Sequence, residues 1–216
     1  MFTRADTRPF RDRREAGREL AAAVGSLELE DPVVVGLPRG GVPVAWEVAQ
    51  SLGAPLDVLV VRKLGFPGQE EFAMGAIASG GVRVMGDMDG GWPVSARAVE
   101  AVVAREQAEL VRRERLYRDD RAPLALAGKV LLLIDDGLAT GATMCAAVKA
   151  ARMGRPERIV VAVPVASREA VQNVDALADE VVCVSTPEHF RAVGLWYEDF
   201  GQTGDEEVCA LLRRPS

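Results

Sequence analysis

The sequence predicts an α/β fold with a doubly wound, mainly parallel sheet flanked by helices. Short runs of Val, Ile and Leu alternate with helix-like segments, as in parallel sheets covered on both faces. The run 130–134 ends in two carboxylates and a loop of small residues, which is where open α/β sheets bind ligands. A chain of 216 residues with 49% hydrophobic residues can bury one full core, and its length fits one large domain or one domain with a small appendage. We expect a single domain over residues 1–216.

The first part of the chain predicts a βαβ unit. An amphipathic helix is expected over residues 10–24, and Pro32 opens a strand that reaches Gly36. A loop over 37–41 leads into a helix over 42–52, and a second strand is expected over 56–61. Such a unit pairs its strands in parallel with a right-handed crossover.

The middle of the chain predicts a hairpin and a long helix. Residues 72–84, broken by Ser-Gly-Gly at 79–81, are typical of a β-hairpin with a glycine turn. Residues 86–93 are irregular, and a charged helix is expected over 95–117. Its alternating acids and bases favour a solvated surface.

The rest of the chain continues the alternation of strands and helices. Strands are expected over 130–134, 158–165 and 180–185, with helices after the first strand and over 168–177. An aromatic, irregular tail over 186–200 precedes a final helix over 205–212.

Composition limits the partners. The formal net charge of −6 argues against nucleic acid as a main partner, and no apolar run is long enough to span a membrane. The N-terminus has no hydrophobic signal core, so we expect a cytoplasmic protein. The three cysteines fit no metal or redox spacing and are interpreted as buried structural thiols. The only histidine, His189, is interpreted as structural, and a homodimer is left open.

The segment VLLLIDDGLATGAT, residues 130–143, is the most informative part of the chain. Asp135 and Asp136 provide acceptors for a polyol or a hydrated metal at the end of a buried strand. The loop 137–143 offers backbone amides, two hydroxyls and a helix N-terminus to one anion. A sugar phosphate requires both features, whereas the alternative is a buried strand with an ordinary acidic loop.

This pattern of an apolar strand, two acids, three variable residues and Thr-Gly-x-Thr resembles the phosphoribosyl pyrophosphate signature of the type I phosphoribosyltransferases. The resemblance implies the fold of that family, transfer of a 5-phosphoribosyl group between phosphoribosyl pyrophosphate and a nitrogenous base, and Mg²⁺ as cofactor. Asp135 and Asp136 would hold the ribose hydroxyls and, directly or through water, Mg²⁺. The donor phosphate would bind at Gly137, Ala139, Thr140, Gly141, Ala142 and Thr143.

Two further cationic positions are candidates for binding the pyrophosphate, and the first of them matches the resembled family in place and chemistry. Arg39, Gly40 and Gly41 lie where its loop binds pyrophosphate and often holds a strained peptide, here expected within 37–40. Lys63, taken to end the second strand, would also stabilise the leaving pyrophosphate. The alternatives are a plain turn with a surface arginine and a solvated charge pair.

The resemblance also divides the chain into a core over about 30–185, a hairpin and helical lid over about 86–123, and a C-terminal hood over about 186–204. The lid would close over the site and exclude water. In the hood, Phe190 and Asp199 are the candidates for binding the base, against the alternative of a C-terminal packing segment.

One departure weakens any assignment of the acceptor. Some members of the family carry an Asp directly before the first signature threonine, where this chain has Ala139, so no general acid or base can be named. A non-catalytic protein that binds phosphoribosyl pyrophosphate or a nucleotide is the alternative function. A phosphatase or kinase that uses the Asp pair for a metal is a further one.

Overall fold

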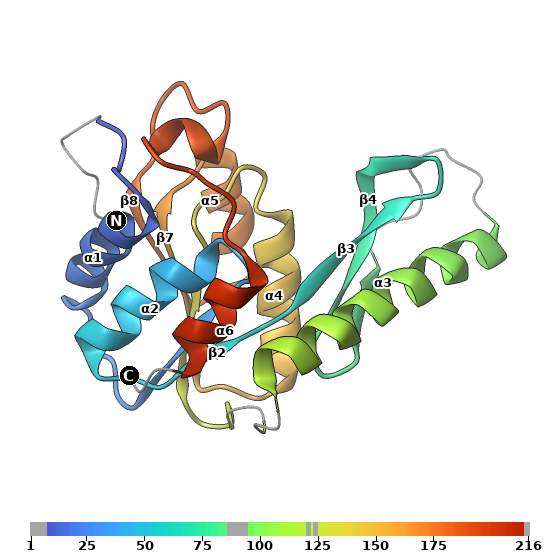
Figure 1. Cartoon of the computed structure of the whole chain (residues 1–216), viewed down its shortest axis with the longest axis horizontal. Coiled ribbons are helices and arrows are strands. Elements are labelled where there is room, and N and C mark those ends of the chain that lie inside the picture. Colours follow the sequence, from blue (N-terminus) through green and yellow to red (C-terminus); the bar gives the residue numbers. More distant parts are fainter. Residues whose placement is uncertain (1–7, 86–94, 120–121, 123–124, 214–216) are drawn as a thin grey trace.

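The core of the protein is a five-stranded parallel sheet with the strand order β2-β1-β6-β7-β8 (Figure 1). The computed structural model describes residues 8–85, 95–119, 122 and 125–213. The core strands are β1 (Pro32–Gly36), β2 (Leu56–Val58), β6 (Val130–Ile134), β7 (Arg158–Val165) and β8 (Glu180–Ser185). These match the predicted strands, except that β2 is shorter than expected.

Helices cover both faces of this sheet, which confirms the doubly wound fold. Side chains of β6 alternate between the two faces, because successive residues of a strand point in opposite directions. Leu132 packs with α1 (Arg13–Val24) and α2 (Gly41–Leu52) on one face. Leu131 packs with α4 (Ala142–Met153) and α5 (Arg168–Asp175) on the other. Burial on both faces explains why the strands read as unbroken apolar runs.

A second, antiparallel sheet extends from one side of the core, with the order β3-β4-β5 (Figure 1). Its strands are β3 (Val61–Phe66), β4 (Gln69–Ala78) and β5 (Val82–Met85). The hairpin of β4 and β5 was predicted, but the single strand over 56–61 was wrong. The chain pairs with β1 only as far as Val58 and then leaves the core sheet to form β3. The run Leu56–Val61 contains no Gly or Pro, so nothing in it marks the change of partner.

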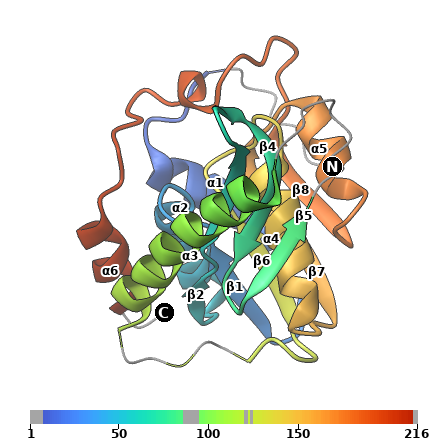
Figure 2. The same cartoon turned by 90° about the vertical axis from the view of Figure 1, so that its right-hand side faces the viewer.

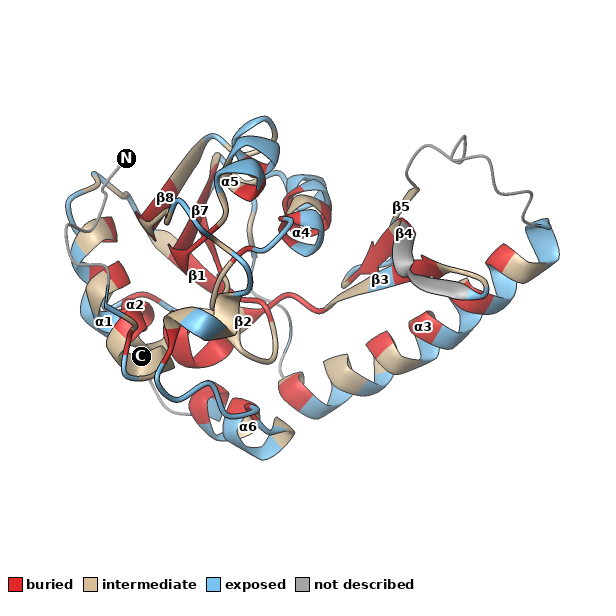
Figure 3. Cartoon of the chain, turned by 90° about the horizontal axis from the view of Figure 1, so that it is seen from above, coloured by how far each residue is buried: buried red, intermediate tan, exposed pale blue. Residues whose placement is uncertain are grey.

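The long helix α3 (Ala96–Arg118) lies along β3 and β4 (Figures 2 and 3). Its buried apolar residues belong to the same cluster as Leu64 of β3 and Met74 of β4. Ser95 caps it by accepting a hydrogen bond from the Ala98 amide. Its last turns reach the C-terminal helix α6 (Asp205–Arg213), and Tyr117 packs with Leu211 and Leu212. The helix was predicted almost to the residue. Most of the remainder of the expected lid, including residues 86–94, lies outside the described residues.

The expected hood is tied to the start of the chain. After β8, a short 3₁₀ helix over Val193–Trp196 leads to Tyr197, which forms a bridge with Phe10. The Glu198 amide donates to the Phe10 carbonyl, and the Tyr197 ring packs 5.6 Å from the Phe10 ring, between centroids. Among the described residues, no helix is both long and apolar enough to cross a membrane.

Candidate functional site

Two loops meet at the point where the sheet changes winding direction. Strands β1 and β6 are neighbours in register, with Gly36 opposite Ile134. The chain then continues to β2 on one side and to β7 on the other, so the loops after β1 and β6 lie next to each other. The contact is close, because a Cβ placed on Gly40 would lie 2.0 Å from the Asp136 Oδ2 atom. A side chain at this position would therefore displace the Asp136 carboxylate from its place beside Arg13.

The loop after β6 forms an anion cradle at the start of α4. Gly141 adopts a left-handed conformation with φ of 77° and leads directly into the helix. Among the hydrogen bonds of the described residues, none uses the amides of Ala139, Thr140 or Gly141. The side chains of Thr140 and Thr143 are exposed. Free amides, hydroxyls and a helix N-terminus are the groups that bind a phosphate.

The same loop lines a cavity of about 210 Å³, together with Asp135 and with Val193 from the hood. Neighbouring elements hold the loop in shape. The Ser167 hydroxyl donates to the Ala139 carbonyl at 2.7 Å, and the Leu138 amide donates to the Val165 carbonyl at 3.0 Å. The cradle is thus supported from β7 and from the start of α5, while the amides of Ala139, Thr140 and Gly141 remain open.

The two carboxylates stand beside this cavity in a buried setting. Burial raises the pKa of Asp135 well above its usual range, and the Asp136 carboxylate adds to the rise. Burial also raises the pKa of Asp136, while Arg13 opposes that rise through charge and a hydrogen bond. The Arg13 Nε atom donates to Asp136 Oδ2 at 2.8 Å. Asp136 was expected as an open acceptor, whereas one of its oxygens already has a cationic partner.

The protein alone offers few ligands for Mg²⁺, so the metal would also need oxygen ligands from a substrate phosphate. Among the described residues, no group of three or more His, Cys, Asp or Glu side chains gathers around one point. Within the described part of the chain, the acidic groups that line the site are the carboxylates of Asp135 and Asp136. Mg²⁺ is usually held by one or two carboxylates, waters and substrate phosphates, so this pair fits a metal that arrives with its phosphate ligand.

Arg39 lies on the neighbouring loop, and its guanidinium is next to an acid of the last helix. Its Nη1 atom is 3.7 Å from Asp205 Oδ1 at the start of α6, and its side chain is 29% exposed. The peptide bond between Pro38 and Arg39 is cis, which places an unusual peptide within the expected segment 37–40.

The placement of Lys63 at the end of a core strand was wrong. Lys63 lies within β3 of the antiparallel sheet, because the chain changes sheets after Val58. It lines a cavity of about 190 Å³ between that sheet and α4, which also contains Thr143 and Lys149. Lys63 therefore faces the side of the cradle rather than the loop after β1.

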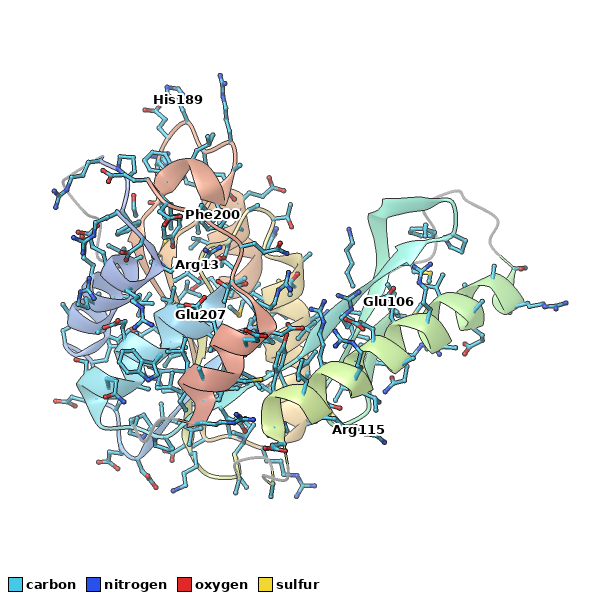
Figure 4. All side chains as sticks on the ribbon, in the orientation of Figure 1. Arg13, Glu106, Arg115, His189, Phe200 and Glu207 are labelled. Carbon is cyan, nitrogen blue, oxygen red and sulfur yellow. The ribbon has the colours of Figure 1, made fainter. Side chains whose placement is uncertain are left out.

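The structure does not bring the two hood candidates to the cradle. Phe190 is half-buried against the apolar core, and the Asp199 Oδ1 atom accepts from the Gly201 amide. Neither lines the 210 Å³ cavity, where Val193 is the hood residue. His189 is exposed at the outer edge of the hood (Figure 4). The base-binding role of Phe190 and Asp199 stays a prediction.

Sequence reasoning missed three residues that build the site. Arg13 reaches Asp136 from α1, Tyr197 donates its hydroxyl to the Asp136 carbonyl at 2.5 Å, and Val193 packs over Gly137. The segment RDRREAGREL gives no signal that one of its arginines turns inward. Tyr197 was noted only as part of an aromatic stretch.

Comparison with known proteins places the chain among proteins of related sequence and fold. Residues 13–198 match the family described as phosphoribosyl transferase domain. A Mycobacterium tuberculosis H37Rv protein named "Putative phosphoribosyl transferase" is 50% identical over 206 residues, which cover 95% of this chain and 46% of that protein. The chain thus spans about half the length of this curated relative.

Solved structures agree with this relationship. The crystal structure of TT1426 from Thermus thermophilus is 50% identical, with a TM-score of 0.83 covering 94% of this chain and 97% of that one. The AQ2163 protein from Aquifex aeolicus is 14% identical, with a TM-score of 0.51 covering 84% and 76%. At that identity the second likeness concerns the fold alone.

Proposed function

This chain belongs to the phosphoribosyl transferase domain family, and on that premise we propose that it transfers a 5-phosphoribosyl group from phosphoribosyl pyrophosphate to a nitrogenous base. The single observation that carries the proposal is the cradle 137–143, where the unused amides of Ala139, Thr140 and Gly141 lie at a helix N-terminus beside two half-buried carboxylates. A phosphate and a neighbouring diol need that combination within a few ångströms of each other.

Each part of the donor has a matching group. The 5-phosphate binds to the amides of Ala139 to Thr143 and to the exposed threonine hydroxyls. The ribose hydroxyls bind to Asp135 and Asp136. The pyrophosphate lies against Arg39, Gly40 and Gly41, and exchanging Asp205 for phosphate oxygens would turn Arg39 toward it. Lys63 approaches from the antiparallel sheet.

The chemistry follows from charge. As pyrophosphate leaves, carbon 1 of the ribose becomes cationic and negative charge builds on the leaving group. Arg39 and Lys63 stabilise that charge, the kind of electrostatic assistance that usually contributes most to catalysis. Mg²⁺, when bound to the pyrophosphate, would neutralise part of the same charge, with Asp135 and Asp136 as its protein ligands. Ala139 stands directly before Thr140 in this chain, so no titratable side chain at that position can take the proton that the acceptor nitrogen loses.

A screen for pyrophosphate release tests the proposal. The protein is incubated with labelled donor, Mg²⁺ and a panel of purines, pyrimidines and nicotinate-like bases. At least one base should give release above the rate without acceptor. Tight donor binding with no release for any base would instead support the regulatory alternative, in which the protein binds the donor or a nucleotide without turnover.

Two substitutions connect the activity to the site. Asp136→Asn and Thr140→Val should each weaken donor binding by about tenfold or more, because each removes a charge or a hydrogen-bonding group from the cradle. Asp175→Asn serves as the matched control, since Asp175 is an exposed residue of α5 away from the cavity. Unchanged donor affinity in both site variants would contradict the assigned roles.

A further inference from the structure

Arg13 connects three parts of the chain that are distant in sequence. It belongs to the first turn of α1 and points inward, with a side chain only 12% exposed. Its Nε atom contacts Asp136, its Nη1 atom donates to the Gly201 carbonyl at 2.7 Å, and its guanidinium lies 4.0 Å from the Phe200 ring centroid. Figure 4 shows Arg13 and Phe200 next to each other above α2.

These contacts fix the Asp136 carboxylate from several sides. Its Oδ2 atom lies between the Arg13 guanidinium and Gly40, where a Cβ would come within 2.0 Å of it. The Tyr197 hydroxyl holds the carbonyl of the same residue at 2.5 Å. Oδ2 is thereby committed to Arg13, and Oδ1 is the atom left for a hydroxyl group.

The pair is enclosed enough for its loss to be costly. Arg13 and Asp136 are 12% and 15% exposed, in contrast to the surface pair of Arg18 and Glu47, where the arginine is 51% exposed. Removing one partner of a mostly buried pair leaves the other charge without compensation, whereas exposed pairs contribute little. Replacing Arg13 should therefore cost more than replacing Arg18, although both belong to α1.

We propose that Arg13 is a positioning residue of the donor site: it fixes the Asp136 carboxylate for the ribose hydroxyls and ties the segment 197–201 to that carboxylate. The proposal rests on the proposed function, because it takes the ribose of the donor as the ligand of Asp136. Arg13 acts through Asp136 and does not touch the reacting atoms.

The link between Asp136 and the segment 197–201 comes from the N–H groups and the flat face of the Arg13 guanidinium. One guanidinium binds the carboxylate, the Gly201 carbonyl and the Phe200 ring, and Phe200 in turn packs against Tyr197 with ring centroids 5.0 Å apart. A lysine has a single ammonium and lacks this planar fork. Arg13→Lys should therefore restore the charge beside Asp136 without restoring the tie.

The test compares ribose 5-phosphate with inorganic phosphate as calorimetric probes, well below the melting midpoint of each variant. Inorganic phosphate reports on the cradle alone, and ribose 5-phosphate adds the diol. Arg13→Gln should lower the affinity for ribose 5-phosphate by about tenfold or more and that for phosphate by less than about twofold. Arg13→Lys should recover most of the lost affinity, and the control Arg18→Gln should change neither.

Hydrogen exchange measures the tie without any ligand. The peptide 197–201 contains the Glu198 and Asp199 amides, which donate to the carbonyls of Phe10 and Arg11. Arg13→Gln and Arg13→Lys should both speed exchange in this peptide, and Arg18→Gln should not. If Arg13→Gln fails to fold, Phe200→Leu removes the ring under the guanidinium and should speed exchange while keeping the affinity for ribose 5-phosphate.

The outcomes separate this inference from the proposed function. Wild-type affinity for ribose 5-phosphate in Arg13→Gln, or an equal loss for both probes, overturns the inference while pyrophosphate release continues to support the transferase. A wild-type protein that neither binds the donor nor releases pyrophosphate overturns the proposed function and the ribose role together. Unchanged exchange at 197–201 in both Arg13 variants overturns the tie.

Discussion

Gly41→Ala tests whether the two loops of the site must touch. A Cβ at Gly41 would lie 2.7 Å from the Ile134 carbonyl oxygen and 2.8 Å from the Asp135 Cα atom. Both are backbone atoms at the end of β6, in the centre of the sheet, and they cannot rotate away as a side chain would. The loops after β1 and β6 therefore have to separate by several tenths of an ångström.

The expected cost combines two opposing terms. Overpacking of this kind costs about 1 to 3 kcal/mol, while alanine gains up to about 1 kcal/mol over glycine in a helix. Because the colliding atoms are backbone atoms, the overpacking cost should lie in the upper part of that range, at about 2 to 3 kcal/mol. The net loss is then about 1 to 2 kcal/mol, which should lower the melting midpoint by roughly 2 to 8 °C for a chain of this size. Separated loops should also weaken binding of the donor by about tenfold, because pyrophosphate and ribose would no longer be held together.

The assays are thermal unfolding followed by circular dichroism and calorimetric titration with the donor. Gly204→Ala is the matched control, because a Cβ there has no neighbour within 4 Å, and its stability should change by no more than about 0.5 kcal/mol. If Gly41→Ala melts within about 1 °C of the wild type and binds the donor equally well, then neither stability nor donor binding depends on the close contact between the loops.

Two further predictions concern charge. Asp205 accepts a hydrogen bond from the Tyr117 hydroxyl at 2.6 Å, and its Oδ1 atom lies 3.7 Å from the Arg39 Nη1 atom. Asp205→Asn should therefore free Arg39 and tighten the binding of inorganic pyrophosphate. The expected gain is up to about fivefold, because an exposed ion pair contributes at most about 1 kcal/mol. Titration against the control Glu206→Gln measures this, and unchanged affinity would show that Asp205 does not compete for Arg39. Cys183 is 2% exposed, and burial raises its pKa from 9.0 to about 12, so the native thiol should resist iodoacetamide. The thiol ionises at lower pH in the unfolded chain than in the folded protein, so rising pH favours the unfolded chain. The free energy of unfolding should therefore fall as pH rises from about 9 to about 12. Cys183→Val should flatten that decline in denaturant titrations, and an equally steep decline would contradict the assignment to this thiol.

Most of the fold and the centre of the site could be predicted from local sequence patterns. The apolar run Val130–Ile134 is buried along its whole length, and the loop that follows it is open, as its composition predicted. The information lies within fourteen consecutive residues, where strand, turn and helix start each have their own signal. The cradle needed no knowledge of the rest of the chain.

Local patterns could not predict which distant strand or side chain a given residue contacts. Hydrophobic periodicity reports that a residue is buried but not which sheet buries it, and Leu56–Val61 divides between two sheets without a break in the pattern. Arg13 and Asp136 are 123 residues apart, and nothing in either segment encodes the other. Lys63 was misplaced and Arg13 was missed for the same reason, because both depend on tertiary contacts.

The charged groups of the site are held from the two ends of the chain. Asp136 is paired with Arg13 of the first helix, and Arg39 is near Asp205 of the last. The first pair is short and mostly buried, so it acts as a fixed part of the site. The second is longer and about 30% exposed on both sides, so an incoming anion can displace it at little cost. An acid that stays in place and an arginine that can turn are what a donor with a rigid diol and a departing pyrophosphate requires.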